Sequence, residues 1–321
     1  MDLFGNEQEV NQRELRYYQS EATLAVMDAW SKGEIPLLTM ATGTGKTIVM
    51  AELARIIHAG NGKTLIGAHR EELVRQAQDK IGSHVGYTPA IEMAGEWADS
   101  RARIVIGSIQ TMQRQRLGRW KPDYFSHFFI DEAHHAVCTS YKNMIKHFES
   151  AKLLGVTATA DRPDDKQLGN IFTKVAYDYP LHKAIKDGYL VPIKGRRCKD
   201  FSIDLSGLKI TAGDFSDEEL GGAIEKYIDP IAKNVIEQTA GMSTLCFCPN
   251  VDSSRLLAES LQRQGIEAGY ISGNTDKELR RDTLYRFHTG IITHLCSCNV
   301  LLEGYDEPRT QAIVMLRPTG S

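Results

Sequence analysis

The segment 41–47, Ala-Thr-Gly-Thr-Gly-Lys-Thr, constrains the fold of this chain more than any other stretch. An apolar run at 35–40 precedes it, and the residues at 48–54 have helical periodicity, so the segment joins a strand to a helix. Gly43 and Gly45 let backbone N–H groups approach phosphate oxygens where a Cβ would collide, and the helix N-terminus adds partial positive charge. The pattern therefore predicts a phosphate-binding loop in an α/β fold.

Two side chains give this loop its chemistry. Lys46 can reach the β- and γ-phosphates of a nucleotide, and the Thr47 hydroxyl can ligate Mg²⁺. Thr42 and Thr44 add backbone N–H groups to the same cradle. The general pattern has glycine at position 40, where this chain has Met40, so a glycine-rich turn with an incidental lysine is the alternative.

Length and composition indicate a two-domain globular protein. The chain has 321 residues, of which 42% are hydrophobic and 25% charged, and no apolar run is long enough to span a membrane. The N-terminus is acidic and lacks the apolar core of a signal peptide, and six cysteines form no disulfide framework. We therefore expect a cytoplasmic protein with reduced thiols. It is expected to be a monomer by itself.

The hydrophobic pattern places strands and helices in alternation along the whole chain. Strands are expected at 35–40, 64–68, 90–93, 104–108, 128–130, 153–157, 244–248, 268–271, 294–298 and 311–316. Such alternation favours mostly parallel sheets covered by helices on both faces. The pattern weakens near residue 190, and the polar stretch 200–222 has no clear period, so it is expected to be a connector or an exposed excursion.

A second chemical feature is the pair Asp131-Glu132, at the carboxyl end of an apolar strand. In an open parallel sheet, ligands bind outside the carboxyl ends of the strands, so this pair is expected beside the phosphate loop. There Asp131 can hold Mg²⁺ while Glu132 polarises an attacking water. The alternative is a pair of solvated surface acids.

Together these segments resemble a superfamily 2 helicase or translocase with two RecA-like domains. Asp131-Glu132-Ala133-His134 has the form of a DEAH box, and Ala-Thr-Gly-Thr-Gly-Lys-Thr is the loop form that such enzymes use, which accounts for Met40. The resemblance implies an ATP-binding domain at 1–190 and a helicase C-terminal domain at 191–321. ATP would lie between the two domains, and its hydrolysis would drive movement along a nucleic acid. The details look most like the XPB/Rad25-like and phage-type branch, which shares features with restriction-enzyme motor subunits.

The resemblance assigns roles to further residues. Arg16 and Gln19 match the adenine-reading motif, and Gly304 and Asp306 match a second-domain motif that contacts the nucleotide. His134, Thr157 and Thr159 match positions that couple the domains. The positions that match nucleic-acid-contacting motifs are His69, Arg70, Ser108, Gln110, Thr111 and Asn250.

One family motif is not seen, because the chain ends at Ser321 before the expected Gln-x-x-Gly-Arg-x-x-Arg. The resemblance therefore implies a second domain that is truncated at its C-terminus. A chain with such a truncation is expected to bind ATP better than it hydrolyses it. Three functions stay open: a DNA helicase or translocase, a nucleic-acid-binding regulator deficient in hydrolysis, and a motor module of a restriction or defence complex with a nuclease partner. DNA is preferred over RNA from the branch alone, and no membrane partner is expected.

Other features leave alternatives open. The net charge of −3 means that nucleic-acid binding must come from local basic patches, and each of these patches is more typical of a solvated face than of a phosphate contact. Trp120 lies among Arg116, Arg119 and Lys121 and is either a base-stacking or a structural aromatic. Two Cys-x-Cys pairs on predicted strands are more typical of buried small side chains than of a zinc site.

Overall fold

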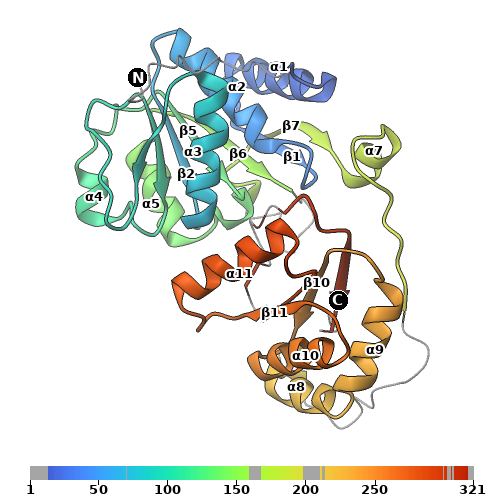
Figure 1. Cartoon of the computed structure of the whole chain (residues 1–321). Coiled ribbons are helices and arrows are strands. Elements are labelled where there is room, and N and C mark those ends of the chain that lie inside the picture. Colours follow the sequence, from blue (N-terminus) through green and yellow to red (C-terminus); the bar gives the residue numbers. More distant parts are fainter. Residues whose placement is uncertain are drawn as a thin grey trace, which may run out of the picture. The chain divides into compact units, whose positions relative to one another are not determined.

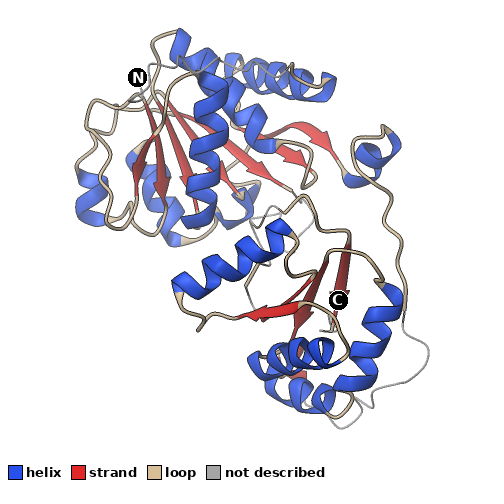
Figure 2. Cartoon of the chain, in the orientation of Figure 1, coloured by secondary structure: helices blue, strands red, loops and turns tan. Residues whose placement is uncertain are grey.

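A computed structural model gives the fold of residues 14–69, 71–158, 168–197, 210–211, 214–298, 300–301, 305 and 307–316. The chain forms two compact units, Met1–Ile193 and Lys194–Ser321 (Figure 1). Each unit is an α/β unit with its own parallel sheet, which confirms the predicted fold class (Figure 2). No helix among the described residues is long and apolar enough to cross a membrane.

The first unit is built on a seven-stranded sheet in the order β3-β4-β2-β5-β6-β1-β7. Its strands are β1 (Pro36–Met40), β2 (Thr64–Ala68), β3 (Ala90–Glu92), β4 (Ile104–Ser108), β5 (His127–Asp131), β6 (Lys152–Thr157) and β7 (Lys174–Tyr179). Neighbouring strands pair in parallel, so their carboxyl ends share one edge of the sheet, here called the carboxyl edge. The central strands are buried along their whole length, which explains their continuous apolar sequences.

Helices cover both faces of this sheet. The first-unit helices are α1 (Tyr17–Ser31), α2 (Lys46–Ala59), α3 (Glu71–Val85), α4 (Arg114–Gly118), η1 (Ala133–His135), α5 (Thr139–His147) and α7 (Leu181–Lys186). Side-chain alternation along β5 separates the two layers: Phe129 packs in one core with α1, α2 and α3, whereas Phe128 and Ile130 pack in a second core with α4 and α5.

The second unit has a four-stranded parallel sheet in the order β11-β12-β10-β13. Its elements are α8 (Asp217–Glu225), α9 (Ile228–Gln238), β10 (Thr244–Cys248), α10 (Val251–Arg263), β11 (Ala268–Ile271), α11 (Lys277–Thr289), β12 (His294–Cys298) and β13 (Ala312–Met315). Helices α8, α9 and α10 share a core with one face of the sheet, and Phe287 of α11 packs on the other.

Two segments, 174–179 and 200–222, differ from the sequence-based expectation. The stretch 200–222 contains a two-stranded antiparallel ladder, β8 (Ile210–Thr211) with β9 (Asp214–Phe215), and the start of α8. Strand β7 was not predicted, because it is an edge strand with exposed positions such as Lys174 and Val175. The cysteines on β10 and β12 pair in register and are buried, in agreement with their interpretation as small core side chains.

Candidate nucleotide-binding site

The phosphate loop lies at the carboxyl edge, where β1 ends and α2 begins. Gly43 and Gly45 have left-handed φ angles of 85° and 90°, which side chains with a Cβ rarely adopt. Between them Thr44 is buried, and its Oγ1 donates a hydrogen bond of 2.6 Å to the carbonyl of Ala41. The loop therefore turns sharply and leaves the first N–H groups of α2 directed away from the helix, as an anion site requires.

The carboxylate pair lies beside this loop. Strand β5 ends at Asp131, two strands from β1 in the sheet, and Lys46 Nζ lies 4.0 Å from Glu132 Oε1. Asp131 Oδ1 accepts a hydrogen bond of 3.0 Å from the Glu132 amide. Glu132 adopts a left-handed φ of 50°, a conformation that is strained for a non-glycine residue and is common at functional turns.

The local charge balance at this pair is negative. Burial and the neighbouring Glu132 carboxylate raise the pKa of Asp131 to about 6, against the opposing effect of Lys46. Two carboxylates next to one ammonium group leave one negative charge uncompensated, and a further cation can balance it. Oxygen ligands of this kind suit Mg²⁺, and the Thr47 hydroxyl at the start of α2 can complete them.

Two histidines, His134 and His135, lie next to the carboxylate pair at the carboxyl edge. His134 Nδ1 lies 3.3 Å from Glu132 Oε2 and 3.4 Å from Oγ1 of Thr157, at the end of β6. His135 stacks on His69 and packs at a tilt against His134, with ring centroids 4.8 Å and 4.1 Å away. No local pattern singles out His135, because its stacking partner His69, which follows β2, is distant along the chain. Thr159 lies outside the described residues.

Of the two predicted adenine-reading residues, Gln19 contacts the phosphate loop directly. Gln19 Nε2 donates a hydrogen bond of 3.0 Å to the Thr44 carbonyl, and Gln19 Oε1 accepts one of 2.9 Å from the Arg16 amide. Tyr18 Oη also donates to the Thr44 carbonyl, at 2.9 Å, and its ring stacks on Tyr179. The start of α1 is thus fixed to the loop, and Tyr18 and Tyr179 are supporting residues that motif matching did not identify.

The described residues that were predicted to contact nucleic acid lie in both units: four follow β2 or end or follow β4 in the first unit, and one is in the second unit. His69 and Gln110 follow β2 and β4 and lie together, with Nε2 atoms 3.4 Å apart, and Thr111 comes next in the chain. Ser108 is buried, and its carbonyl accepts the Thr111 amide in a tight turn. In the second unit Asn250 caps α10, accepting a hydrogen bond of 2.7 Å from a backbone amide in its first turn. Three further predicted residues lie outside the described part of the chain: Arg70, Gly304 and Asp306.

Trp120 is a structural residue, because it is 2% exposed in the core beneath α4. This favours the structural alternative over base stacking. The neighbouring guanidinium groups of Arg116 and Arg119 instead pair with the buried carboxylate of Glu92.

Comparison with known proteins gives matches to both units. Residues 12–162 match the family described as "Type III restriction enzyme, res subunit", and residues 226–321 match "Helicase conserved C-terminal domain". The chain is 28% identical to IRC3 of Saccharomyces cerevisiae, a protein assigned by name to the ATP-dependent helicases, over 96% of this chain and 47% of that protein. It is also 30% identical to "DNA 3'-5' translocase XPB2" of Sulfurisphaera tokodaii over 48% of this chain and 32% of that protein.

Solved structures agree on the fold. A fragment assigned to the HsdR subunit of a type I restriction enzyme from Vibrio vulnificus YJ016 superposes with a TM-score of 0.72 at 20% identity, covering 100% of this chain and 61% of that one. The chain spans about half the length of the first curated relatives that it matches, at 47% and 51%. Because both family models and the tandem RecA-like fold agree with the sequence motifs, the chain belongs to the superfamily 2 helicases.

Proposed function

We propose that this chain is an ATP-driven DNA helicase or translocase motor, which uses ATP hydrolysis to move along a DNA strand. The observation that supports this best is the 4.0 Å approach of Lys46 Nζ to Glu132 Oε1, which joins the phosphate loop to the carboxylate pair at one sheet edge. Preference for DNA over RNA follows the name of the XPB2 relative, a DNA translocase.

The nucleotide is expected to bind through the phosphate loop. Lys46 and the amides of Thr42, Gly43, Thr44 and Gly45 hold the phosphates, and Arg16 and Gln19 read the adenine. Because the Gln19 amide also holds the Thr44 carbonyl at 3.0 Å, recognition of the base would tighten or release the phosphate loop through one side chain.

The donor set at the carboxylate pair fits Mg²⁺, with Thr47 and Asp131 as ligands. The ion would neutralise charge on the phosphate oxygens when bound. Glu132 orients and polarises the attacking water, and Lys46, at 4.0 Å, balances its charge. His134 and Thr157, 3.4 Å apart, would pass changes at Glu132 to the rest of the chain, together with Thr159.

Nucleic acid is expected to bind along the same edge. In the first unit, His69, Arg70, Gln110 and Thr111 would contact the strand, with Ser108 shaping the turn. Asn250 is the proposed nucleic-acid contact of the second unit. Such contacts go mainly to the sugar-phosphate backbone, so binding should weaken with salt and depend little on sequence.

A second candidate function is the motor module of a restriction system with a nuclease partner. It is favoured by the match of residues 12–162 to the Type III restriction enzyme res subunit. Co-purification of a nuclease or methyltransferase subunit from the native cell would support this candidate, and isolation of the chain alone would count against it.

The test of the main proposal is an ATPase assay with and without single-stranded DNA or RNA. DNA is expected to stimulate hydrolysis more than RNA, and Lys46→Ala is expected to abolish it. Lys32→Ala, at a lysine whose side chain is 60% exposed, is the matched control and should retain the parent rate. Hydrolysis by Lys46→Ala at the parent rate would refute the site assignment, and stimulation by RNA alone would refute the DNA preference.

A further inference from the structure

We propose that Trp97 is a base-stacking contact for single-stranded DNA, in addition to the residues that family motifs identify. The inference rests on the proposed function, because it assigns a further part of the strand's path. The chain has three tryptophans, and two of them, Trp30 and Trp120, are 8% and 2% exposed. Trp97 is 56% exposed, so its ring is available to a ligand.

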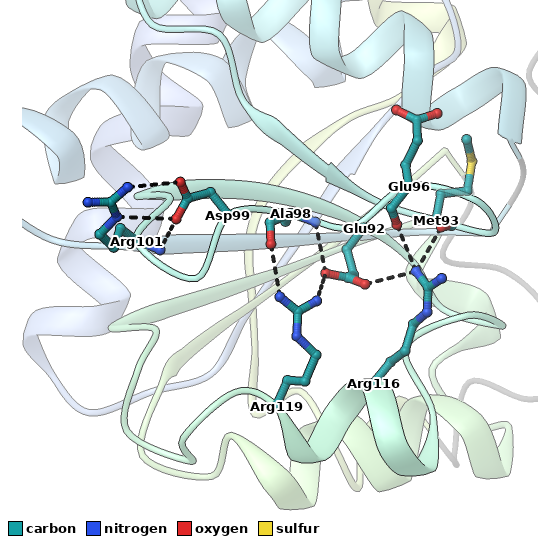
Figure 3. Close-up of polar contacts among 8 residues, drawn as sticks. All are labelled: Glu92, Met93, Glu96, Ala98, Asp99, Arg101, Arg116 and Arg119. Carbon is teal, nitrogen blue, oxygen red and sulfur yellow. Dashed lines mark hydrogen bonds and ion pairs between the residues drawn. The ribbon is translucent and has the colours of Figure 1, made fainter.

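Trp97 lies in a loop that is fixed on both sides. Just before it, the carbonyl of Glu96 accepts a hydrogen bond of 2.7 Å from Arg116 Nη1. Just after it, the Ala98 amide donates to Glu92 Oε2 at 3.1 Å, and the Ala98 carbonyl accepts from Arg119 Nη2 at 3.0 Å. Figure 3 shows these contacts converging on Glu92, Arg116 and Arg119. The backbone that carries the indole is therefore preorganised, which lowers the entropic cost of binding.

The buried centre of this arrangement is Glu92. Its side chain is 0% exposed and accepts hydrogen bonds from Arg116 at 2.8 Å and Arg119 at 3.0 Å. The two guanidinium groups also lie over the Trp97 ring, with their Cζ atoms 3.8 Å and 4.8 Å from its centroid. Because one carboxylate is shared by two arginines, the group carries an excess of positive charge directly beside an exposed aromatic ring.

An exposed aromatic ring beside positive charge is the combination that proteins use to bind single-stranded nucleic acids. A base stacks on an aromatic face, and nearby guanidinium groups attract the phosphates that flank it. The indole packs against the two guanidinium groups, and because the residue is 56% exposed, part of its ring is open to a stacking base.

The position of Trp97 agrees with the expected path of the strand. Glu92 pairs in register with Gly107, next to the turn that carries Gln110. Glu96 forms an ion pair with Arg75 of α3, the helix that begins just after His69. The loop that carries Trp97 is therefore connected to both first-unit segments that family motifs assign to nucleic acid, those after β2 and β4. It lies next to them, after the edge strand β3.

The test is titration of the full chain with oligo(dT), followed by tryptophan fluorescence and by the anisotropy of a labelled oligonucleotide. DNA is expected to quench the parent fluorescence, since the other two tryptophans are buried. Trp97→Ala should bind about 5- to 150-fold more weakly, the range found for loss of one stacked base. Trp97→Phe keeps a stacking face and should retain most of the affinity while losing the quenching.

A matched control is Leu24→Ala, which removes an apolar side chain that is 67% exposed on α1 and should bind like the parent. Binding of Trp97→Ala with the parent affinity, or absence of quenching when the parent is saturated with DNA, would overturn the role of Trp97 and leave the proposed function standing. A parent chain that binds no DNA would overturn both.

Discussion

His127 is expected to make the first unit lose stability as the pH falls below its ordinary pKa. It begins β5, its ring lies 4.9 Å from the Trp30 ring, and its register partner on β6 is Lys152. Burial, and secondarily the positive charge of Lys152, lower the pKa of His127 from 6.5 to about 4. The folded chain therefore holds this imidazole neutral over a range in which the unfolded chain protonates it.

The sign and size of the effect follow from linkage. Below about pH 6.5 the unfolded state binds a proton that the folded state binds only near pH 4, so the free energy of unfolding falls as the pH is lowered through this window. At ~1.4 kcal/mol per pKa unit, the full loss is about 3 kcal/mol, and at about pH 5 it is roughly 2 kcal/mol. Above pH 6.5 the imidazole is neutral in both states and contributes nothing to the pH dependence.

Urea unfolding followed by tryptophan fluorescence measures this loss. All three tryptophans lie in the first unit, so the signal reports the unfolding of that unit alone. Between about pH 7.5 and about pH 5 the parent should lose roughly 2 kcal/mol more than His127→Gln, which cannot titrate. His182→Gln, at an exposed position of α7, is the control and should follow the parent. Equal losses in the parent and His127→Gln would refute the reasoning.

Three further predictions concern the site and its surroundings. Glu132→Gln should retain nucleotide binding but lower the ATPase rate at least ~100-fold, because it removes the group that polarises water; parent turnover in this variant would contradict its role. Gly45→Ala should weaken ATP binding in a thermal-shift assay, because φ is 90° and a Cβ would meet Gln19 Nε2 at 2.5 Å; an unchanged ATP-induced shift would count against this. Glu92→Gln should destabilise the first unit by about 3–5 kcal/mol in urea, because two arginines lose their buried carboxylate, and a loss below ~1 kcal/mol would show that they are solvated instead.

Strands whose sequences are apolar throughout could be predicted from the sequence. A strand that forms only because a neighbouring strand offers it hydrogen-bonding partners could not. The predicted bounds 64–68, 104–108 and 244–248 agree with β2, β4 and β10, because each of these strands is covered on both sides. Strand β7 has its place only because β1 offers a free edge, and of its six residues only Tyr179 is buried. Helix α8 carried a usable signal that was not read, since Ser216 at its N-cap precedes three acidic residues in its first turn.

The same distinction applies to the site. The phosphate loop and Asp131-Glu132 could be identified because each motif is contiguous and follows a strand, and the rule for parallel sheets then predicts that they meet. Contacts such as Gln19 with Thr44, or His135 with His69, join segments that are distant in sequence. No local pattern encodes them, so they became visible only with the fold.

The tryptophans show why local charge is a poor guide to a binding surface. Trp120 is surrounded in sequence by cationic residues, yet it is 2% exposed, because residues on either side of it are drawn into the core beneath α4. Trp97 follows an acidic residue and is 56% exposed, and Arg116 and Arg119, which both precede Trp120 in sequence, lie over the Trp97 ring. The cations turn this way because Glu92, more than twenty residues earlier, holds their guanidinium groups. A sequence can thus identify the charged residues of a segment, but the buried carboxylate that orients them decides which aromatic ring they lie against.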